Sequence, residues 1–281
     1  MPDETIRSMT VDNLRYAYRL LRGPAPRTHP IVLLGGVFQG MYDWAPMEKA
    51  LLPVADVVTL GSDTGDSTAP AIPLAPHLLS RAIAQVIDDL GAEQVNLFGY
   101  SYGSVIVHRY AQAHPRRVAR LVLGGVPWNI PDARRRLKER AATFSEGQEA
   151  ALASMLAETM LCMDPDLPVL NRELAYRYVR RTLLQQLRIP HARQALEQGS
   201  DMVCDMTADG LDGIPTLVFS GAHDTLIPVP TQRAFAATIA GSSFVVLDSS
   251  DHWVLLERPA EVAALALHHF TDLPPAPRGT P

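Results

Sequence analysis

The sequence has few of the features that mark several specialised classes of protein. It contains two cysteines, Cys162 and Cys204, which lie far apart and lack the Cys/His spacing of a metal site. Its net charge of −5 provides no basic footprint for nucleic acid or an anionic membrane. No apolar run is long enough to span a bilayer. We therefore expect no metal, nucleic acid or membrane partner, and free buried thiols, with one disulfide as the alternative.

The beginning of the chain also lacks a targeting signal. Residues 1–5 read Met-Pro-Asp-Glu-Thr, without the basic stretch and apolar core of a secretion signal, so we expect a cytoplasmic location. Apolar residues, by contrast, are abundant and make up 47% of the 281 residues. That content excludes a disordered chain and allows one large domain, or one domain that carries an insertion.

Patterns typical of strands and helices alternate along most of the chain. A weak alternation over residues 5–22 predicts an antiparallel hairpin at a sheet edge. Short apolar runs predict buried strands at 31–34, 54–60, 95–100, 118–126, 215–221 and 244–247. Helical periodicity predicts helices at 44–52, 77–90, 102–114, 231–239 and 259–270. This rhythm indicates an α/β fold with a mostly parallel sheet and helices on both faces.

The rhythm is interrupted between residues 128 and 213, where helical patterns dominate, most clearly at 150–161 and 174–187. We interpret residues 128–213 as a helical cap inserted into a core formed by residues 1–127 and 214–272. The proline-rich tail, residues 273–281, is expected to be disordered.

The motif with the clearest chemistry lies between a predicted strand and a predicted helix. Residues 99–103 read Gly-Tyr-Ser-Tyr-Gly, the Gly-x-Ser-x-Gly pattern of a nucleophile elbow. Such a turn is so tight that only small residues fit two positions before and after the serine. The pattern predicts Ser101 as a nucleophile that is exposed at the carboxyl end of the sheet.

A serine nucleophile needs a base, and the base needs an acid that orients it. In a parallel sheet these groups should follow other strands at the same edge. Asp224 follows the strand at 215–221, and His252 follows the strand at 244–247, which gives the order Ser101, Asp224, His252. Alternatives stay open for each partner. They are His223, His108 and His114 for the base, and Asp248 and Asp251 for the acid.

These motifs resemble those of the α/β-hydrolase fold superfamily, in its serine-nucleophile (Ser-Asp-His) branch with a helical cap. The resemblance covers residues 10–271 and includes residues 33–37, 251–253 and 257–259. It implies an eight-stranded, mostly parallel sheet with a cap over the active site. Family members usually have His-Gly where this chain has Gly35-Gly36, and that histidine braces the loop.

The remaining site predictions concern the oxyanion and the substrate. An oxyanion hole needs two N–H donors, and we expect them from Tyr102 and from Val37, with Phe38 as the alternative to Val37. An apolar substrate pocket is expected to include Phe38, Tyr100, Trp128 and Trp253.

We therefore expect a cofactor-free serine hydrolase that cleaves an ester or thioester through an acyl-serine intermediate. The alternatives are an acyltransferase with an alcohol or amine acceptor, and a non-catalytic ligand-binding relative. The expected partner is a small-molecule acyl substrate. A CoA thioester or an acyl carrier protein is also considered, because the predicted cap helices carry Arg172, Arg177, Arg180, Arg181 and Arg188.

Overall fold

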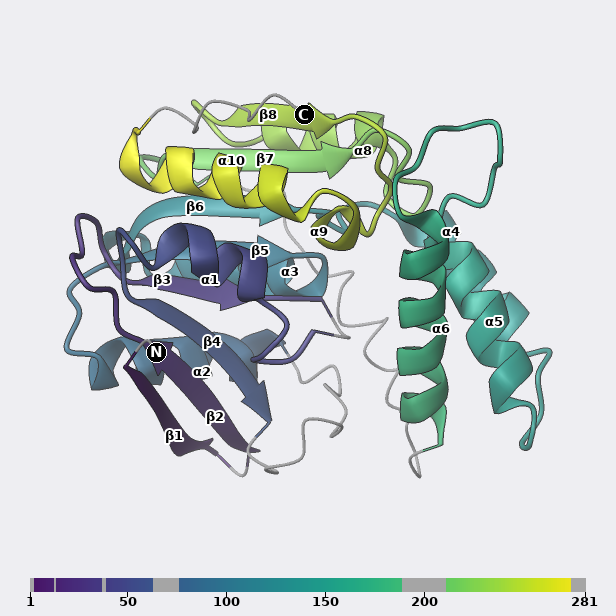
Figure 1. Cartoon of the computed structure of the whole chain (residues 1–281), viewed down its shortest axis with the longest axis horizontal. Helices are drawn as coiled ribbons and strands as arrows, with labels where there is room; N and C mark the ends of the chain where they lie inside the picture. The colour runs from purple at the N-terminus through teal and green to yellow at the C-terminus, as the bar shows by residue number, and fades with distance from the viewer. Residues whose placement is uncertain (1–2, 13, 37–38, 63–75, 189–210, 274–281) are drawn as a thin grey trace.

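A computed structural model describes residues 3–12, 14–36, 39–62, 76–188 and 211–273 of the chain (Figure 1). The strands are β1 (Glu4–Val11), β2 (Leu14–Leu21), β3 (Ile31–Leu34), β4 (Val57–Ser62), β5 (Val95–Tyr100), β6 (Val118–Gly124), β7 (Thr216–Gly221) and β8 (Ser243–Leu247). The helices between and after these strands, apart from those of the cap, are α1 (Ala45–Leu51), α2 (Pro76–Asp89), α3 (Tyr102–Ala113), the short 3-10 helix η1 (Pro115–Arg117), α8 (Val229–Ala237), α9 (Val254–Glu257) and α10 (Pro259–Thr271). The strands and helices predicted from the sequence are present, with ends that differ by about three residues or fewer.

All eight strands form one sheet in the order β1-β2-β4-β3-β5-β6-β7-β8. Strand β2 runs antiparallel to β1 and β4, and the other neighbouring strands pair in parallel. The predicted fold class, an α/β fold with a mostly parallel eight-stranded sheet, is confirmed. Because parallel strands end at one edge, the segments that follow β5, β7 and β8 meet there.

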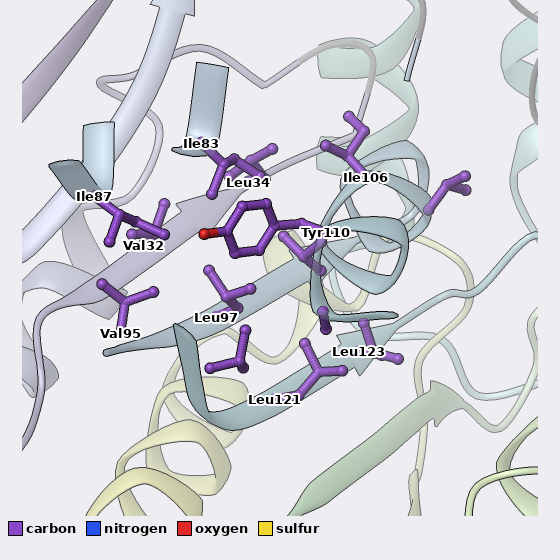
Figure 2. Packing of buried hydrophobic residues seen from close by; sticks show 14 of the residues in the cluster. Val32, Leu34, Ile83, Ile87, Val95, Leu97, Ile106, Tyr110, Leu121 and Leu123 are labelled. Carbon is purple, nitrogen blue, oxygen red and sulfur yellow. The ribbon is translucent and has the colours of Figure 1, made fainter. Parts of the chain in front are cut away.

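The central strands are buried on both faces. Val32 and Leu34 of β3 pack in a cluster with α2, α3 and α8, whereas Ile31 and Leu33 pack with α1 and α10 on the other face. Figure 2 shows the first cluster around Tyr110. Since neither face is exposed to water, these strands appear in the sequence as continuous apolar runs rather than as alternating ones.

Three described helices lie between β6 and β7, namely α4 (Pro131–Ala141), α5 (Glu149–Met160) and α6 (Arg172–Leu187). They lie beyond the carboxyl ends of the strands, at the right of Figure 1. We use "cap" for these helices and their connections. Helices α5 and α6 share an apolar cluster, and Trp253 and Leu256, which follow β8, pack against it. The cap therefore contacts the segment that carries His252.

Some predictions fall outside the described residues. The predicted tail does so apart from Leu273, and Cys204 does so entirely, whereas Cys162 is a buried free thiol. Across the parts of the chain that the structure describes, no helix combines the length and apolar character that a membrane crossing requires.

Candidate active site

Ser101 occupies a strained turn between β5 and α3. Its φ of 50° and ψ of −118° lie in a region that non-glycine residues rarely adopt. The backbone is fixed there because the Ser101 N–H donates to the carbonyl of Gly124, at 2.8 Å. A Cβ atom at Gly99 would lie 2.4 Å from a Val107 methyl, and one at Gly103 would lie 2.3 Å from the Leu34 carbonyl oxygen. The two glycines of the motif are thus required by close packing of strand, helix and neighbouring loop.

The structure brings the predicted base to this serine. His252 Nε2 lies 3.1 Å from Ser101 Oγ, which is hydrogen-bonding distance. His252 itself is 4% exposed, and its carbonyl oxygen accepts a hydrogen bond from the Tyr100 hydroxyl. Its ring is therefore held in a buried site next to a half-buried serine. This is the geometry that general-base activation of a serine requires.

The predicted acid lies on the other side of the imidazole. Asp224 Oδ2 is 2.9 Å from His252 Nδ1. Its second oxygen, Oδ1, accepts the backbone N–H groups of Leu226 at 3.0 Å and Ile227 at 2.7 Å. Asp224 thus orients the ring so that Nδ1 carries the proton and Nε2 can accept one from Ser101.

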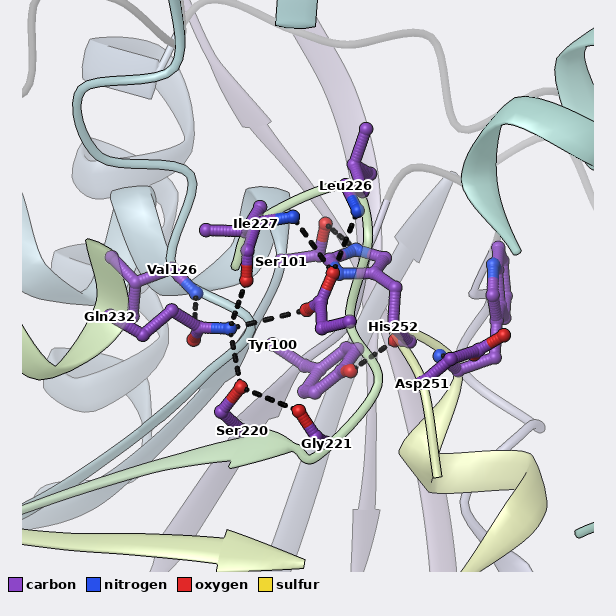
Figure 3. A network of polar contacts seen from close by, with 12 residues as sticks. Tyr100, Ser101, Val126, Ser220, Gly221, Leu226, Ile227, Gln232, Asp251 and His252 are labelled. Atoms are coloured by element: carbon purple, nitrogen blue, oxygen red, sulfur yellow. Dashed lines mark hydrogen bonds and ion pairs between the residues drawn. The ribbon is translucent and has the colours of Figure 1, made fainter. Parts of the chain in front are cut away.

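Gln232, on α8, is a component of the site that we did not predict from the sequence. Its fully buried amide donates from Nε2 to Asp224 Oδ2 at 3.1 Å and to Ser220 Oγ at 2.7 Å. Its Oε1 accepts the Val126 N–H at 3.1 Å (Figure 3). Gln232 therefore connects the acid to the ends of β6 and β7. The only signal in the sequence was a polar residue near the start of the helix that follows the acid loop.

The environment raises the pKa of His252 above its ordinary value of 6.5. Burial alone lowers this pKa, but the charge and hydrogen bond of Asp224 and the charge of Asp251 more than offset that effect. A raised pKa makes the imidazole a stronger proton acceptor once it is neutral.

The alternative candidates lie elsewhere. His108 is buried in the core against Phe235, with ring centroids 5.5 Å apart, and His114 is exposed at the end of α3. The side chain of Asp251 does not orient the ring, because its oxygens accept the N–H groups of Cys162 and Trp253. Asp248 is exposed. The distances to Ser101 and to the imidazole therefore favour His252 as the base and Asp224 as the acid.

Of the residues predicted to form the oxyanion hole, Tyr102 lies within the described part of the chain. Tyr102 opens α3 directly after Ser101, so its N–H lies beside the nucleophile. Val37 and Phe38 lie outside the described residues. Gly36 approaches the serine closely, since a Cβ there would lie 3.3 Å from Ser101 Cβ.

Gln39 holds the glycines that follow β3. Gln39 Oε1 accepts the Gly36 N–H at 2.9 Å, and the Gln39 N–H donates to the Gly36 carbonyl at 3.1 Å. The Gln39 side chain also fills the space beside Gly35, where a Cβ would meet it at 2.4 Å. Gln39 thus occupies part of the space in which a larger residue 35 would lie.

A pocket opens above Ser101 and encloses about 880 Å³ of empty space, part of it continuous with solvent. Tyr100 and Trp253, both predicted, line it, whereas the half-buried Trp128 packs against the core next to Phe235, with ring centroids 6.0 Å apart. The other described lining residues are mostly apolar and include Trp44, Met47, Met160, Tyr178, Leu226, Leu255 and Leu256. The pocket suits an apolar group attached to the reacting carbonyl.

The described residues contain no group of three or more His, Cys, Asp or Glu side chains suited to hold a metal.

Comparisons with known proteins agree with this architecture. The family model described as alpha/beta hydrolase fold matches residues 29–259. A poly(3-hydroxyalkanoate) depolymerase from Ectopseudomonas oleovorans is 25% identical, over 95% of this chain and 93% of its own length. A 2-hydroxy-6-oxononadienedioate/2-hydroxy-6-oxononatrienedioate hydrolase from Klebsiella pneumoniae is 24% identical, over 85% of each. The crystal structure of a hydrolase from Pseudomonas aeruginosa PA01 superposes with a TM-score of 0.73 at 22% identity, over 95% of this chain and 98% of that one.

Proposed function

This chain belongs to the alpha/beta hydrolase fold family and is a hydrolase of its serine class, and on that basis we propose that it cleaves an ester or thioester through an acyl–Ser101 intermediate. The observation that supports this proposal most is the continuous contact from Ser101 Oγ to His252 Nε2 at 3.1 Å and from His252 Nδ1 to Asp224 at 2.9 Å. In this proposal the core, assigned to residues 1–127 and 214–272, supplies these groups. The cap is assigned to residues 128–213, and its described helices α5 and α6 contribute Met160 and Tyr178 to the pocket above Ser101.

In the proposed mechanism, His252 takes the proton from the Ser101 hydroxyl as its oxygen attacks the substrate carbonyl. The resulting oxyanion accepts hydrogen bonds from the N–H of Tyr102 and from that of Val37 or Phe38. His252 then gives its proton to the leaving alcohol or thiol, and the acyl group stays on Ser101. Water attacks the acyl-serine with His252 again as base, which releases the acid and restores the serine.

The pocket favours a neutral, apolar acyl group. Asp43 is an acidic member of the described lining, and most other described members are aromatic or aliphatic. An apolar chain gains free energy when it leaves water for such a surface, at about 25 cal/mol for each Å² buried. A carboxylate placed near Asp43 would instead meet charge of the same sign.

The direct test compares wild type with Ser101→Ala on a series of p-nitrophenyl esters. We expect kcat to fall by about 10⁴-fold or more, because no other group would carry the acyl intermediate. A fluorophosphonate probe should label the wild type at Ser101 and leave the variant unlabelled. Undiminished hydrolysis by a folded Ser101→Ala protein would refute the assignment, and a folded wild type that the probe never labels would indicate a non-catalytic binder.

An acyltransferase would use the same groups with a different acceptor. Adding alcohols or amines during ester turnover and measuring condensed product separates the two outcomes. We expect water to be the dominant acceptor, so product from an added acceptor should rise only at high acceptor concentration.

A second candidate function is hydrolysis of a carbon–carbon bond. It takes its support from the Klebsiella relative, whose name describes a hydrolase of a dicarboxylic 2-hydroxy-6-oxo acid. Such a substrate would carry two negative charges into a pocket that Asp43 lines. We therefore expect kcat/KM on that compound to be well below the value on a neutral ester of similar length. The reverse order would favour carbon–carbon bond hydrolysis.

Presentation of the acyl donor by CoA or by an acyl carrier protein requires that the cap recognises the carrier. Arg172 donates to the Leu167 carbonyl, and Arg180 donates to Ser154 Oγ at 2.7 Å. Arg177 Nε lies 4.0 Å from Glu173 Oε1, so at least three of the five cap arginines contact the cap itself. We therefore propose a free small-molecule substrate. Equal kcat/KM for an acyl-CoA and the matching N-acetylcysteamine thioester would support this.

The cytoplasmic location stays a prediction that cell fractionation can test.

A further inference from the structure

The histidine loop, residues 248–253, is hydrogen-bonded to the cap at two points. The Cys162 N–H, just after α5, donates to Asp251 Oδ2 at 2.7 Å. The Leu170 N–H, just before α6, donates to the Ser249 carbonyl at 2.9 Å. The two ends of the α5–α6 connection, residues 161–170, are thus both attached to the loop that carries the proposed base.

Asp251 is the residue where these attachments converge on His252. Its side chain is fully buried, and its second oxygen accepts the Trp253 N–H at 2.7 Å. Its own backbone N–H donates to Glu257 Oε2 at 2.7 Å. One carboxylate therefore binds the cap with one oxygen and the residue after His252 with the other, while its backbone is anchored to α9.

A buried carboxylate needs these donors, because an unpaired charge away from water is very unfavourable. If the cap withdrew, Asp251 Oδ2 would lose the Cys162 N–H, and water or a rearranged loop would have to replace it. The packing of Trp253 and Leu256 against the cap cluster, with Tyr178 and Trp253 ring centroids 6.3 Å apart, would be lost in the same movement. The first change acts on Asp251 and the second on Trp253, the two residues that flank His252.

We propose that Asp251 is a positioning residue that couples the cap to the base, so that His252 lies at Ser101 only when residues 161–170 are docked. The proposal rests on the proposed function, since it assigns His252 its role as the base. It gives the cap a second task besides covering the substrate: the docked cap completes the catalytic geometry. Figure 3 shows Asp251 beside His252, on the side opposite Gln232.

The first test replaces Asp251 with Asn. The amide oxygen can still accept the local Trp253 N–H, but an NH2 group then faces the Cys162 N–H, so this one of the two attachments to the cap is lost. We expect kcat on a short p-nitrophenyl ester to fall by about 10- to 100-fold with KM changed by less than about 3-fold. Labelling by a small fluorophosphonate should slow by a similar factor, because it too depends on His252. Asp248→Asn, an exposed residue of the same loop, is the matched control and should behave as wild type.

The second test removes the donor from the cap side and leaves the histidine loop unchanged. Cys162→Pro deletes the N–H, and the preceding residue suits a proline because Leu161 has φ of −119° and ψ of 151°. Cys162→Ala keeps the N–H and is the control for the lost thiol. We expect Pro, and not Ala, to reproduce the kinetic defect of Asp251→Asn, with faster amide exchange in residues 161–170 and 249–256.

Folding is checked by thermal unfolding, and Cys162→Pro keeps the proposal testable if Asp251→Asn does not fold. A folded variant with faster amide exchange in residues 161–170 but unchanged kcat and labelling rate would overturn the proposal. Amide exchange at the wild-type rate in both 161–170 and 249–256 would overturn it as well. If these variants are unaffected while Ser101→Ala is inactive, the coupling fails and the proposed function stands. If Ser101→Ala stays active, the proposed function itself fails.

Discussion

The two loops that meet at the imidazole are held in different ways. In the part of the chain that the structure describes, the acid loop, residues 222–227, is held by groups of the core. Asp224 accepts N–H groups within that loop and the Gln232 amide of α8, and the His223 N–H donates to the Ser250 carbonyl. The histidine loop is fixed partly by the core, through Tyr100, and partly by the cap, through Cys162 and Leu170. The site thus has one half that the sheet determines and one half that depends on an inserted element.

This difference shows how a fold can vary its cap without losing its chemistry. An acid held by β6, β7 and α8 keeps its place whatever the cap does. By our proposal, a base whose loop also binds the cap moves out of reach when the cap withdraws. Local opening needs less free energy than global unfolding, so the histidine loop is where we expect the site to respond to motion of the cap.

The largest expected effect comes from breaking the core-held half with Asp224→Asn. The amide can keep accepting the Leu226 and Ile227 N–H groups, but its NH2 then faces His252 Nδ1 and forces the proton onto Nε2. That tautomer cannot accept the Ser101 proton, so we expect kcat to fall by about 10³- to 10⁴-fold. The measurement is ester turnover against pH. A loss smaller than about tenfold would show that another group orients the imidazole.

A smaller effect is expected from Gln232→Met, which removes the link between the acid and the two strands. The Val126 N–H and Ser220 Oγ lose their amide partner, so the free energy of unfolding should fall by about 2–4 kcal/mol. Because Asp224 keeps its two backbone donors, kcat should fall by only about tenfold. Gln185→Met, an exposed position on α6, is the control. An unchanged kcat would mean that the acid loop positions Asp224 without α8.

The cap can be tested where it lines the pocket rather than where it binds the histidine loop. Met160 lines the pocket, whereas Met155, Leu156, Leu183 and Leu187 are buried within the cap cluster. Met160→Ala should shift the preferred acyl chain length, changing the ratio of kcat/KM between long and short esters by about 3- to 10-fold. Met155→Ala, on the same helix, should lower stability and leave that ratio unchanged. Equal shifts in both variants would show that the cap acts through its overall packing.

A pH-dependent effect on stability, with no direct role in catalysis, is expected at Glu257, which anchors Asp251 from α9. Burial, the charge of Asp251 and a side-chain hydrogen bond with it raise the pKa of Glu257 well above the ordinary value of 4.5. The folded protein then holds a proton that the unfolded chain has lost, so stability falls as the pH rises from 4.5 towards the raised pKa. Glu257→Gln should remove that loss, which is at most about 1.4 kcal/mol per pH unit. Unfolding by denaturant at several pH values measures it, and parallel pH profiles for the two proteins would contradict it.

Much of the fold followed from the sequence because its signals are local. The Gly-x-Ser-x-Gly turn, the apolar strands and the loops after β7 and β8 each carry their own pattern, and topology brings Ser101, Asp224 and His252 together. Gln232 and Asp251 could not be identified in this way, because their roles depend on contacts with Val126 and Cys162, which are 106 and 89 residues away along the chain. Trp128 shows the converse, since this aromatic residue at the cap boundary packs against the core and is not part of the described pocket lining.

The most direct measurement of the central claim is the mass of the enzyme during turnover. Wild type mixed with a p-nitrophenyl ester and quenched with acid within the first turnovers should carry one added acyl group. Peptide mapping should place that group on Ser101. Ser101→Ala should carry no adduct, and His252→Ala should form it far more slowly. Steady ester hydrolysis with an adduct on a different residue, or with none at any quench time, would contradict an acyl–Ser101 mechanism.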